Sequence, residues 1–436
     1  MKKMIVPLVG ALVAFTSLDA VAKTERVNGY VWVYDVIDDR WAANYNSVVV
    51  SGTDQYYGKV TGDITIPSTL GGKPVKCIAE KAFKGCQEIS SVIIPDGVTK
   101  IERSAFYECT GLTSITIPAS VKSIGEYAFS RCRRLKSVHI TDIAAWCGIS
   151  FDDSANPLVF ANLYHNGAIV EDLTIPNGVK SIGRGAFYEY KGLKSVTIPG
   201  SVWSIGEDAF SFCGNITKVK IGNGVSVIGK NAFYSCKSLK SIVIPDGVRE
   251  VGTWAFLGCS GLTSLTIGKG QKSIEKEVFS GCSGLTSVTI PDGVEFIGFG
   301  AFKDCSGLKS VTIPASVTKI FDGMTWGGML PDSTPFYGVC NVETLTTPIF
   351  PCGMSKSSIK HLTIPNGVTS IADGEFEGCT GLISITIPEG VTSIGSRAFA
   401  GCSNLTKVKI PKSVTSIDNT AFSGCSKLKK IPMPSR

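Results

Sequence analysis

The sequence contains very few of the side chains that enzymes commonly use for proton transfer. Only three of its 436 residues are histidine, and the glycine-rich phosphate loop, the HExxH zinc motif and the calcium-binding nonapeptide repeat are all missing. His139 and His361 lie more than 200 residues apart, so they are unsuited to forming one catalytic pair. We therefore expect no catalytic residue, no cofactor and no metal ligand.

Long apolar segments and long basic runs are also missing. The N-terminal apolar run, Met4 to Phe15, is shorter than the roughly 20 residues that span a bilayer. Two lysines precede it and Ala20-Val21-Ala22 follows it, as in a signal peptide. We expect cleavage after Ala22 and an exported chain without a membrane span. The net charge of +7 is not concentrated in any basic run, so we expect no nucleic-acid partner.

Cysteine is plentiful, but its spacing argues against a disulfide framework. Of the 15 cysteines, 11 occupy one position of a repeat, mostly 23 residues apart. Such a column of thiols could bind a soft metal or cross-link its neighbours, but buried free thiols are expected, since cysteine packs as a small apolar residue. Cys340 and Cys352, near an irregular segment, are the better disulfide candidates. The repeat cysteines are Cys86, Cys109, Cys132, Cys213, Cys236, Cys259, Cys282, Cys305, Cys379, Cys402 and Cys425.

The repeat itself is best seen between Leu112 and Cys132. A leucine-like position is followed by Ile115 and Ile117, by the Ala128-Phe129 pair and by the cysteine. Twelve copies keep the phenylalanine, and a fixed period of 20 to 29 residues with such leucine-like positions is typical of leucine-rich repeats. The conserved phenylalanines are Phe83, Phe106, Phe129, Phe187, Phe210, Phe233, Phe256, Phe279, Phe302, Phe376, Phe399 and Phe422.

Each repeat predicts one coil of a solenoid. Alternation places Ile115 and Ile117 on the inner face of a strand, which Pro118 ends because it has no N–H to donate. The chain then returns across the far side, and a glycine eases the bend. The remaining corner, with the phenylalanine and cysteine, is a short helical or 3₁₀ turn. We predict about 14 stacked coils of 23 residues, with a parallel β-sheet on one face and short strands or 3₁₀/helical turns on the others.

The period also predicts the domain boundaries. Residues 1–22 are the signal peptide, and 23–61, rich in alternating aromatic and β-branched residues, form an N-terminal β cap over the open core. Residues 62–432 form the solenoid, and 433–436 are a tail. The period is broken near 141–169 and near 321–335, where insertions are expected as loops on one face.

The repeat closely resembles that of the BspA-type leucine-rich repeat family, in which x-Ile-Pro-x-x-Val-x-x-Ile-Gly is followed by Ala-Phe-x-x-Cys. The resemblance covers residues 62 to 432 and implies a bacterial surface or secreted protein whose recurrent role is adhesion. It implies no catalytic residues. The sequence departs from the pattern where Tyr190 replaces the cysteine and where Gly222 and Gly268 replace the proline.

The outward positions of the strands carry the main functional signal. Of 45 such sites, 25 are serine or threonine, 11 are lysine, three are acidic and none is aromatic. This pattern is compatible with an ordinary solvated sheet or with a docking surface for an acidic partner. Sugar stacking on this face is disfavoured. The candidate partner-binding residues are Lys194, Lys218, Lys220, Lys240, Lys309, Lys407 and Lys409, with Met324, Trp326 and Met329 in the second insertion as a possible hydrophobic hot spot.

The sequence thus favours an exported protein-binding or adhesion scaffold that presents its strand face to a macromolecular partner, such as an acidic component of a host or neighbouring cell. A self-associating structural or coat protein is the alternative, and an enzyme is the least favoured class.

Overall fold

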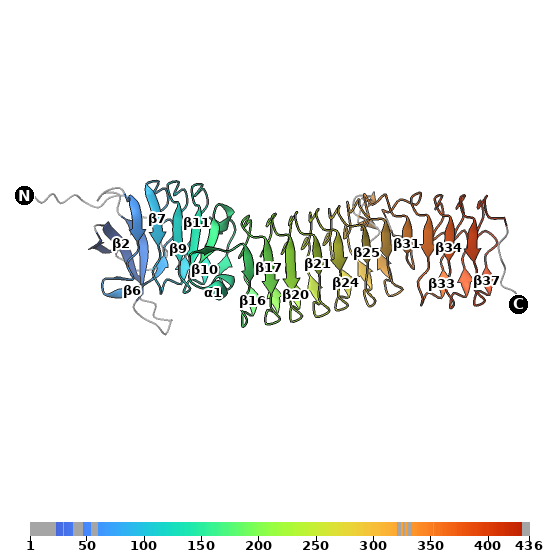
Figure 1. The fold of residues 1–436 in the computed structure, drawn as a ribbon, viewed down its shortest axis with the longest axis horizontal. Helices are drawn as coiled ribbons and strands as arrows, with labels where there is room; N and C mark the ends of the chain where they lie inside the picture. The colour runs from blue at the N-terminus through green and yellow to red at the C-terminus, as the bar shows by residue number, and fades with distance from the viewer. Residues whose placement is uncertain are drawn as a thin grey trace, which may run out of the picture.

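The chain folds into an elongated stack of coils (Figure 1). The computed structural model describes residues 23–28, 30–37, 47–53, 60–320, 324–325, 328–329, 334–351 and 353–429. They form a parallel β-solenoid of about 15 turns with a spacing of about 23 residues, which confirms the predicted fold class. No helix within these ranges is long and apolar enough to cross a bilayer. The predicted signal peptide, residues 1–22, lies outside them.

One face of the stack is a parallel β-sheet to which each coil gives one strand. In β9 (Ser114–Ile117) the isoleucines are buried and Ser114 and Thr116 lie outward, as the alternation predicts. The sheet is divided into three runs. These are β4 (Gly62–Thr65), β7 (Ile89–Ile93), β9, β11 (Ser137–Ile140) and β13 (Asn162–His165); then β15 (Asp172–Thr174), β17 (Ser195–Ile198), β19 (Lys218–Ile221), β21 (Ser241–Val243) and β23 (Ser264–Thr266); then β25 (Ser287–Thr289), β27 (Ser310–Thr312), β31 (Thr344–Thr346), β32 (His361–Thr363), β34 (Ser384–Thr386) and β36 (Lys407–Lys409).

A second face carries two-residue strands, also parallel and in register. They include the isoleucine before each repeat glycine, and this side chain is buried in β10 (Ser123–Ile124). The others are β8 (Lys100–Ile101), β12 (Ser150–Phe151), β16 (Ser181–Ile182), β18 (Ser204–Ile205), β20 (Val227–Ile228), β22 (Glu250–Val251), β24 (Ser273–Ile274), β26 (Phe296–Ile297), β28 (Lys319–Ile320), β33 (Ser370–Ile371), β35 (Ser393–Ile394) and β37 (Ser416–Ile417).

The repeat glycine has a different role from the expected one. A Cβ at Gly125 would lie 2.7 Å from the Arg103 nitrogen, in the backbone of the preceding coil. Glycine is therefore needed because neighbouring coils approach closely there. The bend uses left-handed backbone two residues later, at Tyr127 (φ 57°). A non-glycine residue in this conformation costs about 1–2 kcal/mol, and a hydrogen bond from its N–H to Asp153 of the next coil (3.1 Å) offsets part of that cost.

The corner after this bend holds the phenylalanine and cysteine columns. Phe210, Phe233 and Phe256 are fully buried, and their rings stack at centroid distances of 5.3 Å. The Cys236 N–H donates to the Phe233 carbonyl of its own coil, and the Ala232 and Tyr234 N–H groups each donate to the carbonyl three residues earlier. The corner is thus a series of turns and not a continuous helix. The thiols of the column donate to the phenylalanine carbonyl of the preceding coil, as from Cys236 to Phe210 at 3.3 Å.

The buried thiols give a labelling prediction. Burial raises the pKa of Cys259 and Cys305 to about 12, whereas a free thiol titrates near 8.5. Cys340 is an exposed free thiol, and Cys352, its predicted disulfide partner, lies outside the described residues. At pH 8 a thiol-reactive dye should label Cys340 within minutes, the half-buried Cys77 and Cys86 more slowly, and the buried thiols of the column only after denaturant is added. Because the unfolded thiols ionise first, the free energy of unfolding should fall as the pH rises above about 8.5. Rapid labelling of ten or more thiols in the native protein would contradict this structure.

The N-terminal strands lie at one end of the stack (Figure 1). Strands β1 (Lys23–Val27), β2 (Tyr30–Ile37) and β3 (Ser47–Thr53) form an antiparallel meander, and β3 pairs in parallel with β6 (Lys73–Ile78). β6 also pairs with β5 (Thr69–Leu70). Trp32 is fully buried and packs edge-on against Phe83 at 6.4 Å. It thereby covers the first ring of the phenylalanine column.

The first predicted insertion forms a variant coil that continues both sheets. It contains α1 (Ile143–Cys147), β12, the 3₁₀ helix η2 (Pro157–Val159) and β13, with β14 (Ala168–Ile169) antiparallel to β13. The Trp146 indole donates to the Ala186 carbonyl (2.9 Å), and the Asn156 amide donates to Gly185 (2.7 Å) and Ala186. These two side chains supply bonds that the backbone of a phenylalanine corner makes elsewhere.

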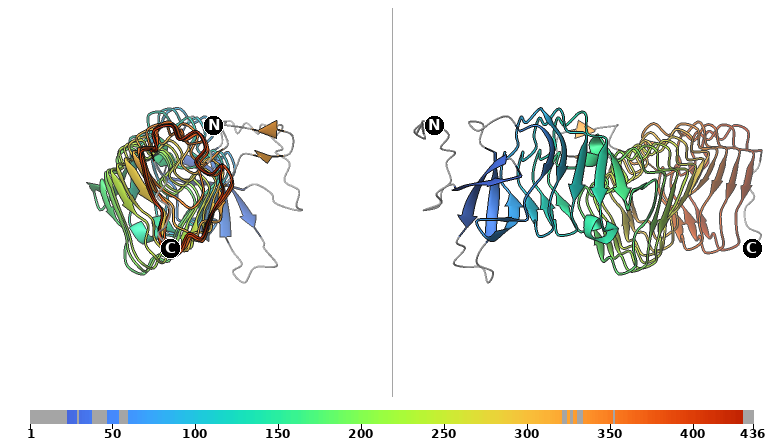
Figure 2. Two further views of the ribbon diagram at one scale, coloured as in Figure 1. Left: turned by 90° about the vertical axis from the view of Figure 1, so that its right-hand side faces the viewer. Right: turned by 60° about the vertical axis from the view of Figure 1, so that its left-hand side comes forward.

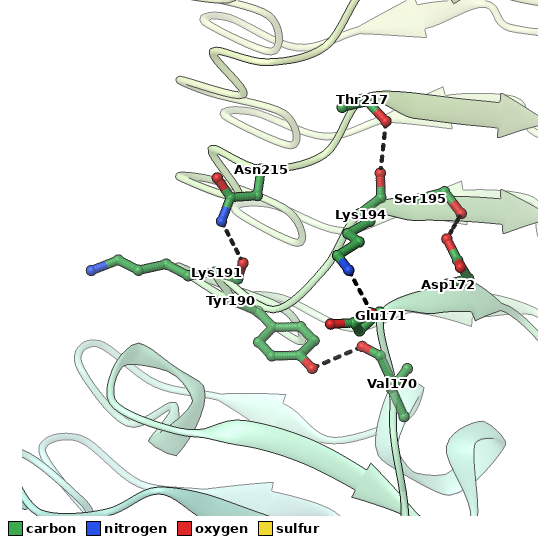
Figure 3. Close-up of polar contacts among 9 residues, drawn as sticks. All are labelled: Val170, Glu171, Asp172, Tyr190, Lys191, Lys194, Ser195, Asn215 and Thr217. Atoms are coloured by element: carbon green, nitrogen blue, oxygen red, sulfur yellow. Dashed lines mark hydrogen bonds and ion pairs between the residues drawn. The ribbon is translucent and has the colours of Figure 1, made fainter.

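Tyr190, which replaces the repeat cysteine, also links the variant coil to the next coil. We call this connection the joint. The Tyr190 hydroxyl donates to the Val170 carbonyl (2.8 Å) and accepts from the Leu163 N–H (3.3 Å). Figure 3 shows the ring reaching from its corner toward the segment before β15. The longer side chain therefore bridges the gap between the first and second runs of the main sheet, where no backbone ladder joins β13 to β15.

The second insertion leaves the stack. Within it, β29 (Met324–Thr325) and β30 (Gly328–Met329) form an antiparallel hairpin that projects away from the coils (Figure 2). The coil itself is restored by Phe336, whose ring stacks on Phe302 at 5.3 Å.

Candidate functional site

The strand face brings three of the predicted lysines together. Lys218 and Lys220 are exposed on β19, and Lys240 is exposed immediately before β21, the next strand. The register pairs Lys218 with Ser195 on one side and with Ser241 on the other. Adjacent strands lie about 4.8 Å apart, so the three ammonium groups occupy one small area. We refer to Lys218, Lys220 and Lys240 as the basic patch.

The neighbouring Lys194 differs from the patch in its electrostatics. Its ammonium lies 2.6 Å from the Glu171 carboxylate of the preceding coil (Figure 3), and this contact raises the pKa of Lys194. Among the described residues, no carboxylate lies within 4.0 Å of Lys218, Lys220 or Lys240. The patch thus keeps its charge unneutralised, while the charge of Lys194 is largely balanced.

The other predicted residues do not join this patch. Lys309 precedes β27, three strands beyond β21 in coil order, and Lys407 and Lys409 lie on the far strand β36. All three are exposed. Met324 and Met329 face one another in register within the projecting hairpin, away from the strand face, and Trp326 lies outside the described residues. The predicted residues therefore belong to at least three separate surfaces.

The expectation of a strand face without aromatic residues is wrong at one place. The variant coil contributes β13, whose Tyr164 lies in register with His139 of β11, and the two rings stack at 5.0 Å. This strand lies inside the segment that the repeat pattern predicts to be an insertion. Its outward positions are therefore not among the 45 strand positions counted from the repeats.

A second surface, absent from the sequence prediction, is a groove of about 800 Å³ along the corner of the coils. The left-handed residues of seven successive coils line it, so at about 4.8 Å per coil it is about 29 Å long. Rings of Tyr188, Phe212 and Tyr234 line it as well. The left-handed residues, one from each coil, are Tyr127, Ser154, Gly185, Asp208, Asn231, Trp254 and Glu277, and Phe212 is left-handed as well.

The groove combines aromatic edges with carboxylates. Phe212, 39% exposed, packs edge-to-face with Tyr188 (5.8 Å) and with Tyr234 (4.9 Å). Burial, reinforced by the charge of Glu207, raises the pKa of Asp208. Arg184 pairs with Asp153 at 2.6 Å. This arrangement offers hydrogen-bond acceptors and ring surfaces on one elongated site.

Comparison with known proteins identifies the family of this chain. The profile of the BspA type leucine rich repeat region matches six copies, over residues 52–151, 159–285, 204–325 and 352–436. The chain belongs to the BspA-type leucine-rich repeat family. Family membership confirms the resemblance seen in the repeat. A comparison with curated protein sequences finds no match.

Solved structures of bacterial leucine-rich repeat proteins are similar to this chain. A leucine-rich repeat protein from Bacteroides ovatus is 25% identical over 91% of this chain and 92% of that chain, with a TM-score of 0.50. A leucine rich cell surface protein from Faecalibacterium prausnitzii is 26% identical over 95% of each chain, with a TM-score of 0.41. The Bacteroides ovatus structure thus has a similar repeat architecture over most of this chain.

Proposed function

We propose that this protein is an exported, non-enzymatic scaffold at the bacterial cell surface, and that its strand face binds an acidic macromolecular partner. Family membership supports a repeat scaffold of the surface or adhesion type. The signal-peptide pattern of residues 1–22 supports export.

The basic patch carries the proposal. Three exposed lysines on neighbouring coils, without a carboxylate partner among the described residues, produce a local positive potential. The surrounding side chains are short: the hydroxyls of Ser195, Thr197 and Ser241, and Val243, which is 58% exposed on β21. They leave the ammonium groups accessible, and the hydroxyls can themselves donate hydrogen bonds. A carboxylate-bearing partner could therefore contact several coils at once.

The test is to replace Lys218, Lys220 and Lys240 together with serine and to measure binding of the mature chain to immobilised poly-L-glutamate. At about 0.5 kcal/mol for each exposed ion pair, the affinity should fall about tenfold. The dependence of affinity on salt should also become shallower.

The matched control removes the same charge elsewhere. Lys180, Lys269 and Lys412 are exposed on turns outside the strand face, so their triple serine variant should bind within about twofold of the unmodified protein. An equal loss of affinity in both variants would show that only the net charge of the protein matters. No loss in the Lys218, Lys220 and Lys240 variant would eliminate the strand face as the binding surface.

A further inference from the structure

The corner groove is a second candidate surface, distinct from the basic patch. Its lining runs from Tyr127, after β10, to Glu277, after β24. Its lining belongs to the bends, whereas the patch belongs to the main strands, so the two sites lie on different sides of each coil. An occupant of the groove must be elongated, because the groove follows the solenoid axis for about 29 Å.

The charge of the groove favours a positively charged ligand. Four carboxylates line it, from Asp152, Asp153, Asp208 and Glu277, against one guanidinium, from Arg184. Asp153 is paired with that guanidinium, and Glu277 lies 3.9 Å from Lys276. Among the described residues, neither Asp152 nor Asp208 has a lysine or arginine within ion-pair distance. The groove therefore has unneutralised negative charge at two points.

Two polar side chains lie beside one of these points. Ser211, 1% exposed, and Asn231 lie against Asp208 and direct polar groups toward its carboxylate, although the buried atoms Ser211 Oγ and Asn231 Oδ1 have no partner of good hydrogen-bonding geometry in the described part of the chain. Polar neighbours of this kind favour the charged form of the carboxyl group. A cation in the groove would stabilise the half-buried Asp208 carboxylate further.

The aromatic rings of the groove also favour a cationic ligand. On this corner the protein's own cations already sit over aromatic rings: Lys230 and Lys276 lie 5.3 and 5.7 Å from the centre of the Trp254 ring. Phe212 and Tyr127 are the most exposed rings of the groove, and no cation–π contact involves either of them within the described residues. They can receive cations from a ligand in the same way.

We propose that the groove binds an extended, lysine- or arginine-rich peptide segment of a partner protein. Its basic side chains pair with Asp152 and Asp208 and pack against Phe212 and Tyr127. Nine residues of extended chain, at about 3.3 Å each, match the length of the groove.

The experiment uses the mature full chain and a fluorescent octalysine peptide, with octaglutamate and cellohexaose as comparison ligands. Octalysine should bind in a salt-dependent manner. Asp208→Asn and Phe212→Ala should each weaken its binding by about fivefold to tenfold. The controls are Glu250→Gln, an exposed carboxylate on β22, and Trp203→Ala, an exposed ring outside the groove; both should bind octalysine as the unmodified chain does.

Several results would overturn the proposal. These are octalysine binding that both groove variants retain, an equal loss in the Glu250→Gln control, or tighter binding of cellohexaose that Phe212→Ala abolishes, which would assign the groove to a neutral glycan. Far-UV circular dichroism confirms that each variant is folded. The triple serine variant of the basic patch should keep its octalysine affinity, so failure of this proposal and failure of the strand-face proposal give different results.

Discussion

Replacing Phe233 with alanine should lower the free energy of unfolding by about 3–5 kcal/mol, the usual cost of removing a fully buried phenylalanine. The ring is completely buried and stacks on the rings of both neighbouring coils at 5.3 Å. Its loss leaves a cavity at two coil interfaces, and the stability of a solenoid depends on just such nearest-neighbour interfaces. Urea unfolding followed by circular dichroism measures the change.

The matched control is Phe212→Ala, which removes the same side chain from a more exposed position in the preceding coil. Phe212 lies on the outer side of the same corner and is 39% exposed, so its loss should cost at most about 1 kcal/mol. If the two variants were equally stable, the phenylalanine column would not be the core of the stack.

Replacing Trp146 with alanine should have an effect of similar size, about 3–5 kcal/mol, but of a different kind. Trp146 is 1% exposed and packs against Phe151 at 5.2 Å. Its indole N–H holds the Ala186 carbonyl of the following coil. Because the main sheet is interrupted at this joint, losing the contact should uncouple the coils before it from those after it. Calorimetry should then resolve two thermal transitions in place of one.

The control for this variant is Trp203→Ala. Trp203 is 55% exposed, and its removal should change the free energy of unfolding by less than about 0.5 kcal/mol without splitting the transition. A single transition in the Trp146 variant, merely shifted to lower temperature, would show that the joint transmits cooperativity through the remaining contacts.

Much of the fold could be predicted because the same side chains recur at the same step. Alternation at Ile115 and Ile117 predicts a strand, and the buried state of Phe129 and Cys132 follows from their 23-residue spacing. The variant coil could not be predicted in this way. Trp146 and Asn156 replace backbone hydrogen bonds with side-chain hydrogen bonds, and the partners of Tyr190 come from segments outside the repeat.

The candidate surfaces could be predicted only in part. The basic patch is visible because Lys218 and Lys240 occupy counted strand positions. The groove was missed because its lining comes from the bends, and residues such as Asp208 and Trp254 adopt left-handed backbone without the glycine that usually marks it. Aligning the residues two before and one or two after each repeat phenylalanine places Tyr188, Tyr234, Phe212, Asp208 and Glu277 on neighbouring coils, but Asp152 and Asp153 belong to the variant coil, which has no repeat phenylalanine.

The Asp208 N–H donates to Lys230 of the next coil and the Phe210 N–H donates to Ala232. The bonds that join regular coils thus come from the backbone and from the inward-facing thiols, and they do not depend on which side chains point outward. The outer residues of a coil can therefore change without disturbing the joint beneath them. Duplicating or deleting a single 23-residue unit between the basic patch and the projecting hairpin would change their separation by about 4.8 Å, and a unit added within the groove would lengthen it by the same step. Within such a family, the number of repeats therefore sets the distance between two surfaces of the solenoid.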